Sequence, residues 1–387
     1  MKPRDLALEL EPGSAWPPTL DRRKRQCSIH ALAAAPRERM VAGRQCNLNV
    51  FEAGNADRPA ILFLHGFPDC HQVWSHQLKN LSDEFHVIAF DLRGCGLSGA
   101  ASEANAYLIE NLLPDIEIVI NAVRGPRAQV HLVGHDWGSV LGWSFVSHPE
   151  YAERVLSWSS ISGVHAGLVL PTLRSQWRQG GRHARAVLGQ LLRSWYVAAL
   201  SLRGVGNAWL RWGGVKALKA VLAQGGVDPD DAYLAMDADT VNRRATASVA
   251  LYRQNLRKLP AAPAARSITV PVQLIVPVLD RFLRPVVYEG LGEVCRHLER
   301  WDIAANHWVQ RSHPNEVTQL LRSFINRQIE TRAKFRTTKG GLNSELPSVQ
   351  ASLQRHAQAN ETPIRTEGVT NGSTSRACRL DESGTLG

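Results

Sequence analysis

Short apolar runs recur along most of the chain, separated by longer amphipathic stretches. Residues 60–64 (AILFL) form a continuous apolar run, which is typical of a strand buried on both faces of a sheet. Residues 47–51 alternate polar and apolar positions, which predicts an edge strand. We expect further strands at residues 87–90, 130–133, 155–158, 272–276 and 298–303. Helical stretches fill the intervals, as at 109–123 and 313–329, and this alternation predicts an α/β fold with a mostly parallel sheet covered on both faces.

The alternation of strands and helices is interrupted once. Residues 162–265 contain several helical stretches and no convincing strand, so we interpret them as a helical cap inserted into the core. The α/β core then comprises residues 39–161 and 266–330. Residues 1–38 are rich in proline and arginine, and we expect a weakly ordered basic extension there. Residues 331–387 contain few large apolar residues, which predicts a disordered tail.

Composition narrows the class of protein. With 387 residues and 44% apolar content, the chain can bury a sizeable core. Its six cysteines are scattered without a Cys-x-x-Cys pair, which argues against a disulfide framework or a zinc site and favours a reducing compartment. No run approaches the roughly 20 apolar residues that span a bilayer, and no secretory pattern opens the chain. We therefore expect a cytoplasmic location.

One acidic residue stands where an enzyme nucleophile is expected. Asp136 lies between Gly134 and Gly138, directly after the apolar run at 130–133 and before a predicted helix. The corresponding Gly-x-nucleophile-x-Gly turn normally carries serine. A carboxylate there can attack a strained or halogenated carbon and leave an alkyl ester on the protein. The pattern therefore favours hydrolases of saturated carbon over esterases and lipases.

Such a displacement also needs an oxyanion hole, a general base and an acid that orients the base. The backbone N–H groups of Phe67, in a turn after a predicted strand, and of Trp137, next to the nucleophile, are the candidate oxyanion-hole donors. His307 is the candidate base, because it follows the last predicted strand, at the edge where α/β folds place their sites. Asp280 also follows a strand and is the candidate orienting acid. The rival position, the loop after residues 155–158, contains no acid.

Four segments carry a family resemblance: HGFPD at 65–69, DLRGCGLS at 91–98, GHDWG at 134–138 and NHWVQ at 306–310. Together they resemble the epoxide hydrolase and haloalkane dehalogenase branch of the α/β-hydrolase fold, most closely its epoxide hydrolases. The resemblance implies an α/β-hydrolase core with an inserted helical cap, although Asn306 stands where the family commonly has glycine. The chain is also similar to the hydrolase module of bacterial epoxide hydrolases fused to a short-chain dehydrogenase, but it contains no Gly-x-x-x-Gly-x-Gly signature.

The resemblance implies further site residues. Epoxide hydrolases carry two cap tyrosines that hold and protonate the epoxide oxygen, and the segments around Tyr196 and Tyr252 are similar to theirs. A phenol can share the charge of an alkoxide leaving group without adding full charge to an apolar pocket. The alternative is that each tyrosine only packs between helices. We also expect four side chains to line the substrate pocket: His65, Pro68, Trp195 and Trp308.

The expected function is hydrolysis of a lipophilic epoxide to a vicinal diol through an ester on Asp136, with water as second substrate and no metal or organic cofactor. A haloalkane dehalogenase is the nearest alternative, with the indoles of Trp137 and Trp195 as halide donors. Against it, Phe67 stands where many dehalogenases have asparagine. A non-catalytic homologue that keeps the pocket to bind a ligand is a second alternative.

The net charge of +10 is unevenly distributed. From Arg174 to Lys219 the predicted cap carries basic residues and no acid, with four tryptophans interleaved. This composition suits peripheral contact with an anionic membrane, whereas a solvated helical face over a packed cap is the alternative. No recognition motif accompanies the charge, so nucleic-acid binding is not expected. The sequence leaves the oligomeric state open.

Overall fold

The computed structural model describes residues 36–339, apart from residue 236. The chain divides into two units, Met1–Thr331 and Arg332–Gly387, and the sheet and the candidate site lie in the first. Most of the predicted extension (1–38) and of the predicted tail (331–387) lies outside the described residues. Among the residues that are described, no helix combines the length and the apolar character needed to cross a membrane.

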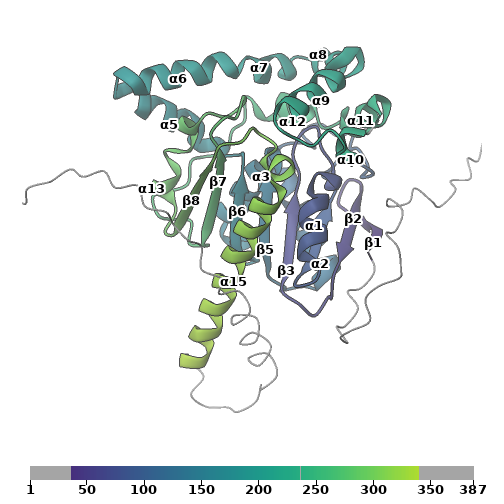
Figure 1. Ribbon diagram of the computed structural model, residues 1–387, viewed down its shortest axis with the longest axis vertical. Coiled ribbons are helices and arrows are strands. Elements are labelled where there is room, and N and C mark those ends of the chain that lie inside the picture. Colours follow the sequence, from purple (N-terminus) through teal and green to yellow (C-terminus); the bar gives the residue numbers. More distant parts are fainter. Residues whose placement is uncertain (1–35, 236, 340–387) are drawn as a thin grey trace, which may run out of the picture. The chain divides into compact units, whose positions relative to one another are not determined.

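An eight-stranded sheet forms the centre of the first unit (Figure 1). Its strands are β1 (Arg37–Ala42), β2 (Asn47–Ala53), β3 (Ala60–Leu64), β4 (His86–Phe90), β5 (Val130–His135), β6 (Val155–Ile161), β7 (Val272–Pro277) and β8 (Leu298–Ile303). They lie in the order β1-β2-β4-β3-β5-β6-β7-β8. β2 pairs antiparallel with both β1 and β4, and all other neighbours pair in parallel. The predicted α/β fold with a mostly parallel sheet is confirmed.

Helices connect the strands along the chain, and most of them lie between β6 and β7. Before β6 come α1 (Ser75–Leu81), α2 (Ile109–Arg124), α3 (Trp137–Ser147) and α4 (Pro149–Ala152). Between β6 and β7 come α5 (Ala166–Arg178), α6 (Gly181–Arg193), α7 (Trp195–Ser201), α8 (Val205–Trp209), α9 (Val215–Gln224), α10 (Ala232–Ala235), α11 (Ala238–Ala245) and α12 (Ala250–Asn255). After β7 come α13 (Leu291–Val294), α14 (Val309–Ser312) and α15 (Pro314–Lys339).

Both faces of the central strands of the sheet are buried, as alternate residues of β3 illustrate. Leu62 and Leu64 join the apolar cluster that contains side chains of α2 and α3. Ile61 and Phe63 point the other way, into the cluster formed with α1, α14 and α15. Burying one such side chain stabilises a fold by about 1.5–3 kcal/mol. The sheet is therefore a rigid platform whose strand ends can hold a site in place.

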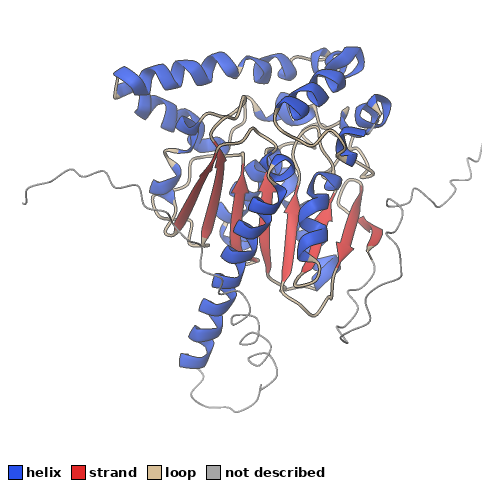
Figure 2. Cartoon of the chain, viewed as in Figure 1, coloured by secondary structure: helices blue, strands red, loops and turns tan. Residues whose placement is uncertain are grey.

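The segment from α5 to α12, here called the helical insertion, lies over one edge of this platform. The arrowheads of the parallel strands point toward it (Figure 2). The residues that follow β3, β5, β7 and β8 therefore meet beneath the helical insertion. In open α/β sheets this carboxyl edge is where ligands bind.

Three local features differ from the sequence-based predictions. The strand at 47–51, expected at an edge, is β2, which lies between β1 and β4. β1 begins at Arg37, inside the expected extension. It was not predicted because half of its residues are charged, most are exposed and it is held by pairing with β2. β6 continues past the predicted 155–158 to Ile161. The hydroxyls of Ser159 and Ser160 are buried there and paired, with Gln273 at 3.0 Å and the indole of Trp143 at 2.9 Å. Buried hydroxyls with hydrogen-bond partners are tolerated in a central strand, so a search for apolar runs does not find this part of β6.

Candidate active site

Asp136 occupies the turn between β5 and α3 in a backbone conformation that non-glycine residues rarely adopt. Its φ is 52° and its ψ is −119°, which costs of order 1–3 kcal/mol and is typical of functional sites. The turn depends on close approach at two glycines. A Cβ on Gly66 would lie 2.3 Å from Asp136 Oδ1, and one on Gly138 would lie 2.3 Å from the carbonyl oxygen of Leu64. Gly66 and Gly138 are therefore required because there is no space for a larger residue.

The Asp136 carboxylate lies at the N-terminus of α3 and accepts a backbone hydrogen bond. The Phe67 N–H donates to its Oδ1 over 2.7 Å. The partial positive charge at a helix N-terminus also favours a carboxylate there. The Phe67 N–H therefore lies beside the Asp136 carboxylate, and its role as an oxyanion-hole donor stays a prediction. The equivalent role of the Trp137 N–H stays a prediction.

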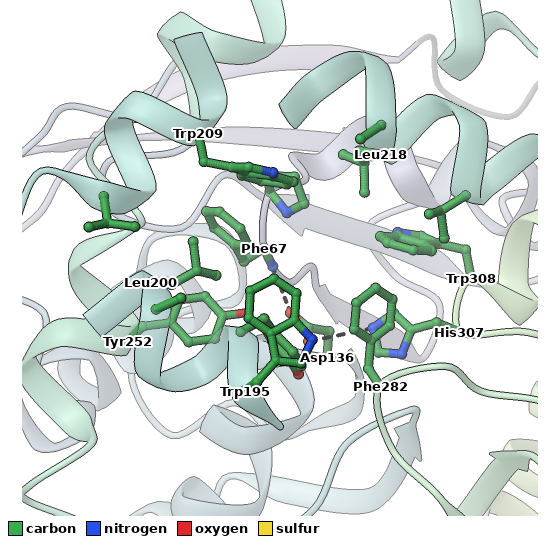
Figure 3. A pocket seen from close by; sticks show the side chains of 16 residues that line it. Phe67, Asp136, Trp195, Leu200, Trp209, Leu218, Tyr252, Phe282, His307 and Trp308 are labelled. Atoms are coloured by element: carbon green, nitrogen blue, oxygen red, sulfur yellow. Dashed lines mark hydrogen bonds and ion pairs between the residues drawn. The ribbon is translucent and has the colours of Figure 1, made fainter. Parts of the chain in front are cut away.

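His307, in the loop between β8 and α14, stands between two carboxylates. Its Nδ1 lies 2.7 Å from Asp280 Oδ2, and its Nε2 lies 3.5 Å from Asp136 Oδ2. Asp280 is itself held, because its Oδ1 accepts the N–H groups of Phe282 at 2.6 Å and Leu283 at 3.1 Å. A carboxylate accepts, so the Asp280 contact places a proton on Nδ1 and turns Nε2 toward Asp136. The three residues predicted as nucleophile, acid and base are therefore brought together, and Figure 3 shows Asp136 and His307 side by side.

The two carboxylates shift the ionisation of His307. Burial disfavours its imidazolium, but the charge of Asp280 and the hydrogen bond to Asp136 outweigh burial and raise the pKa of His307 to about 10. Burial likewise opposes ionisation of Asp136, and the hydrogen bond and charge of His307 outweigh it and lower the pKa of Asp136. At neutral pH the pair is therefore an imidazolium and a carboxylate.

The backbone of the His307 loop is anchored by two side chains that sequence analysis did not select. The Ser162 hydroxyl donates to the His307 carbonyl over 2.7 Å, and His135 Nε2 donates to the same oxygen over 3.0 Å. Burial and the nearby charge of His307 lower the pKa of His135 to about 3, so it is neutral. The only sequence signal was adjacency, since Ser162 follows β6 and His135 precedes Asp136.

Tyr196 of α7 and Tyr252 of α12 reach the same place from the helical insertion. Their ring centroids are 6.2 Å apart, and Tyr252 also makes an edge contact with the ring of Phe67 at 5.2 Å. Burial, followed by the charge of Asp136, raises the pKa of both phenols well above the ordinary value. Both hydroxyls therefore keep their protons at neutral pH and can act as hydrogen-bond donors.

A cavity of about 280 Å³ lies between the strand ends and the helical insertion (Figure 3). Apart from three tryptophans, the lining residues that carry polar side-chain groups are Asp136, His307, Tyr196 and Tyr252. Its other walls are apolar or aromatic and comprise Phe67, Pro68, Trp195, Ala199, Leu200, Val205, Trp209, Ala217, Leu218, Val221, Phe282 and Trp308. Apolar walls with a few convergent polar groups are typical of a small-molecule site.

Three of the four predicted pocket residues, Pro68, Trp195 and Trp308, line this cavity, whereas His65 does not. His65 is fully buried; its Nε2 accepts the N–H of Leu92 at 2.9 Å and its Nδ1 lies 2.8 Å from the Gly66 carbonyl. That prediction was wrong because a motif position does not reveal which way a side chain points. Through its hydrogen bond with Leu92, His65 instead stabilises the turn after β3 that contains Phe67.

Phe282 was not predicted, and it contacts both halves of the site. Its ring lies 5.0 Å from that of His307 and 5.3 Å from that of Tyr196, between centroids. It follows Asp280 by two residues, so the loop that supplies the acid also supplies an apolar wall. The signal available in sequence was this proximity alone.

One group among the described residues has the spacing of a metal site, namely Cys70, His71 and Asp91, all buried. His71, however, contacts carboxylates through both ring nitrogens, Asp91 Oδ1 at 2.9 Å and Glu38 Oε1 at 3.1 Å. Burial lowers the pKa of His71, but these hydrogen bonds outweigh it and raise the pKa to about 9. An imidazolium has no lone pair for a metal, so the group is an ion-pair network that ties β1 to the core.

Comparison with known proteins identifies relatives across the α/β core and the helical insertion. The family described as alpha/beta hydrolase fold matches residues 59–314. A Mycobacterium tuberculosis protein called "Probable oxidoreductase EphD" is 32% identical over 71% of this chain, which spans only 47% of that protein. "Epoxide hydrolase 3" of Mus musculus is 27% identical over 72% of the chain and 73% of its own length. "AB hydrolase superfamily protein YfhM" of Bacillus subtilis is 30% identical over 73% of the chain and 95% of its own length.

Among solved structures, an inhibitor complex of an epoxide hydrolase from Bacillus megaterium is similar in fold. It aligns with a TM-score of 0.62 and 26% identity, covering 74% of this chain and 100% of that one. The chain spans about half the length of the mycobacterial relative. The family match over residues 59–314 includes the elements that carry Asp136, Asp280 and His307.

Proposed function

The chain belongs to the α/β-hydrolase fold family, and we propose that it is an epoxide hydrolase, a hydrolase acting on ether bonds. In the proposed reaction it forms a vicinal diol through an aspartyl ester. One observation carries this proposal. An aspartate in the nucleophile turn faces a cavity into which two protonated tyrosines also project, and His307 lies 3.5 Å from its carboxylate. The substrates are an epoxide and water.

In the first step a carboxylate oxygen of Asp136 attacks a ring carbon, and the carbon–oxygen bond of the strained ring breaks. Tyr196 and Tyr252 donate hydrogen bonds to the ring oxygen as it becomes an alkoxide. The alkoxide takes a proton that originates from the His307 imidazolium and passes through the tyrosine hydroxyls or water. The product is a glycol mono-ester on Asp136 beside a neutral His307.

Loss of the Asp136 charge changes His307 from an acid into a base. The high pKa of His307 depends in part on its hydrogen bond and attraction to the Asp136 carboxylate, so esterification lowers that pKa. His307, held by Asp280, then takes a proton from water, whose oxygen attacks the ester carbonyl. The carbonyl oxygen becomes an oxyanion stabilised by the Phe67 N–H and, as predicted, by that of Trp137.

Collapse of the tetrahedral intermediate completes the cycle. The ester carbon–oxygen bond breaks, the carboxyl proton passes to the departing alkoxide, and a diol leaves. Asp136 is again a carboxylate, and His307 keeps the proton taken from water as an imidazolium. The proton count therefore closes on the resting state that the two pKa shifts favour.

The cavity walls favour a lipophilic substrate held under a cap formed by the helical insertion. Trp195, Leu200 and Trp209 come from the helical insertion, whereas Phe282 comes from the core. An apolar body gains free energy from burial against such walls, at about 25 cal/mol per Å². The polar groups are confined to the end that holds Asp136, which would orient the epoxide toward it.

The test is a pair of variants assayed with a panel of epoxides. Asp136→Ala removes the nucleophile and should abolish diol formation. His307→Gln should still form the ester but hydrolyse it slowly, so the protein should gain the mass of the epoxide. In heavy-oxygen water, the label should enter the peptide that contains Asp136 rather than the diol of a first turnover. Full diol formation by Asp136→Ala would exclude the scheme.

Dehalogenation would use the same nucleophile but other leaving-group donors. Among the described residues, both tyrosines line the cavity and Trp137 does not. Trp195 does line the cavity, so haloalkanes belong in the same assay panel. Release of halide without diol formation from epoxides would favour that alternative. A non-catalytic homologue would bind epoxides without either product and without a mass gain.

A further inference from the structure

α6, α7 and α8 follow one another across the side of the helical insertion that faces away from the sheet (Figure 1). Exposed large hydrophobic side chains are concentrated in this part of the chain. Ten of the sixteen in the described residues lie from Leu170 to Trp212. Scattered exposed leucines are normal on a protein surface, whereas a cluster marks a contact site.

The exposed side chains of residues 182–213 are here called the outer face. Their helical spacing shows that they form a surface of their own and are not the exposed margins of buried core residues. Leu188, Leu192 and Trp195 are four and three residues apart, so they project from one side of the α6–α7 segment. Leu192 is 69% exposed and Trp195 70%, whereas Val187 of the same helix is buried in the core and 3% exposed. Trp212, at the turn after α8, is 86% exposed.

The charge of the same segment has one sign. No aspartate or glutamate occurs between Glu153 and Asp228. The exposed basic residues in that interval are Arg174, Arg178, Arg182, Arg185, Arg193, Arg203, Arg211 and Lys216. Arg185 lies three residues before Leu188, on the same side of α6. Leucine and tryptophan side chains interspersed with arginines along an acid-free stretch of chain suit the headgroup zone of an anionic bilayer.

We propose that the outer face docks the protein on the surface of an anionic lipid bilayer. A second copy of the chain is a poor occupant, because a two-fold interface sets the same patch against itself and would oppose like charges. Nucleic acid would use the arginines but would leave the leucines exposed to water. Charge and apolar surface are satisfied together by acidic headgroups and the acyl boundary beneath them.

The outer face is continuous with the cavity. Trp195 and Trp209 line the cavity and are also exposed, at 70% and 39%. An apolar molecule dissolved in the bilayer could therefore reach the cavity without crossing water. This access route rests on the proposed function, whereas docking itself does not.

The test measures co-sedimentation of the full chain with phosphatidylcholine vesicles that do or do not contain phosphatidylglycerol. We expect binding to the anionic vesicles that weakens as sodium chloride is raised. The double variant Arg185→Gln/Arg211→Gln should lower this affinity about thirtyfold, from about fivefold for each basic residue removed. Trp212→Ser and Leu192→Ser should weaken binding while leaving its salt dependence.

Matched controls separate docking from general changes in charge or apolar surface. Arg58→Gln/Arg127→Gln removes the same charge near the amino ends of β3 and β5, and Trp301→Ser removes an exposed tryptophan from β8; neither should alter binding. Equal binding to both vesicle types, or undiminished binding by the arginine double variant, would overturn the proposal. So would a dimer in ultracentrifugation that Trp212→Ser dissociates, or binding to an oligonucleotide but not to vesicles. Because no substrate is used, failure of the epoxide hydrolase assignment would leave these results unaffected.

Discussion

His307 Nε2 lies 3.5 Å from Asp136 Oδ2, so the residue expected to activate water is first an ion-pair partner of the nucleophile. The pair stabilises the attacking carboxylate and keeps His307 protonated. While His307 is protonated it cannot take a proton from water, so water is not activated before the ester has formed. Under the proposed mechanism, esterification of Asp136 is the event that releases it.

The first prediction concerns the pKa of His307. Asp136→Asn removes the charge and the carboxylate hydrogen-bond acceptor, so the pKa of His307 should fall from about 10. The measurement is an NMR titration of selectively labelled histidine. Asp302→Asn, which removes a carboxylate on β8 that pairs with Arg300, serves as the control and should leave the titration unchanged. An unaltered His307 titration in Asp136→Asn would contradict the ion-pair account.

The second prediction concerns stability against pH. The pKa of His307 is raised from 6.5 to about 10 by folding, so its contribution to stability is full below about pH 6.5 and is lost as the pH rises to about 10. The pKa of Asp136 is lowered from 3.8, so its contribution is full above that pH and is lost on acidification. The difference in unfolding free energy between the wild type and His307→Gln should therefore shrink as the pH is raised from neutral to alkaline. Urea unfolding across that range measures it, and a constant difference would count against the shift.

The third prediction concerns the tyrosines. Tyr196→Phe and Tyr252→Phe should each slow ester formation about a hundredfold, because a positioned donor typically contributes 10²–10⁴-fold. The double variant should be slower than either single variant. Rapid-quench single turnovers distinguish ester formation from hydrolysis, which should change less. Tyr151→Phe, whose ring stacks on Phe145 away from the cavity, is the control and should retain full activity.

The fourth prediction concerns the space around the nucleophile. In Gly66→Ala the new Cβ would lie 2.3 Å from Asp136 Oδ1, so the turn and the Phe67 N–H must move. Loss of one oxyanion-hole donor typically costs about 10²–10³ in kcat. Gly292→Ala adds the same methyl group where no heavy atom lies within 4 Å, and it should retain activity. Diol formation under saturating substrate is the measurement, and equal rates for the two variants would refute the steric argument.

Much of the chemistry could be predicted from the chain alone because it lies at strand ends. Apolar runs locate the strands, and parallel strands present their carboxyl ends at one edge. Asp136 and Asp280 each follow such a run and His307 follows the last predicted strand, so their convergence could be expected across a separation of many residues. The two tyrosines lie in the irregular helical insertion, and only family resemblance pointed to them.

Other features depended on side-chain direction, which local pattern does not encode. His65 was expected in the pocket and instead holds the Leu92 N–H, whereas Phe282 was not expected and forms a wall of it. The motif around His65 specifies a turn but not which side of the turn is open to the cavity. β1 was missed for a related reason, since it is stabilised by its partner strand rather than by its own apolar residues.

The sequence by itself therefore determined the alternation of strands and helices after β1, the acidic nucleophile turn and the one-signed charge of residues 154–227. These properties follow from residue periodicity and composition, which are local. Tertiary structure alone decided the 3.5 Å approach of His307 to Asp136, the shape of the cavity and the gathering of leucines and tryptophans on the outer face. Each of these depends on how elements distant in the chain pack together, and packing is set by the whole fold rather than by any single segment.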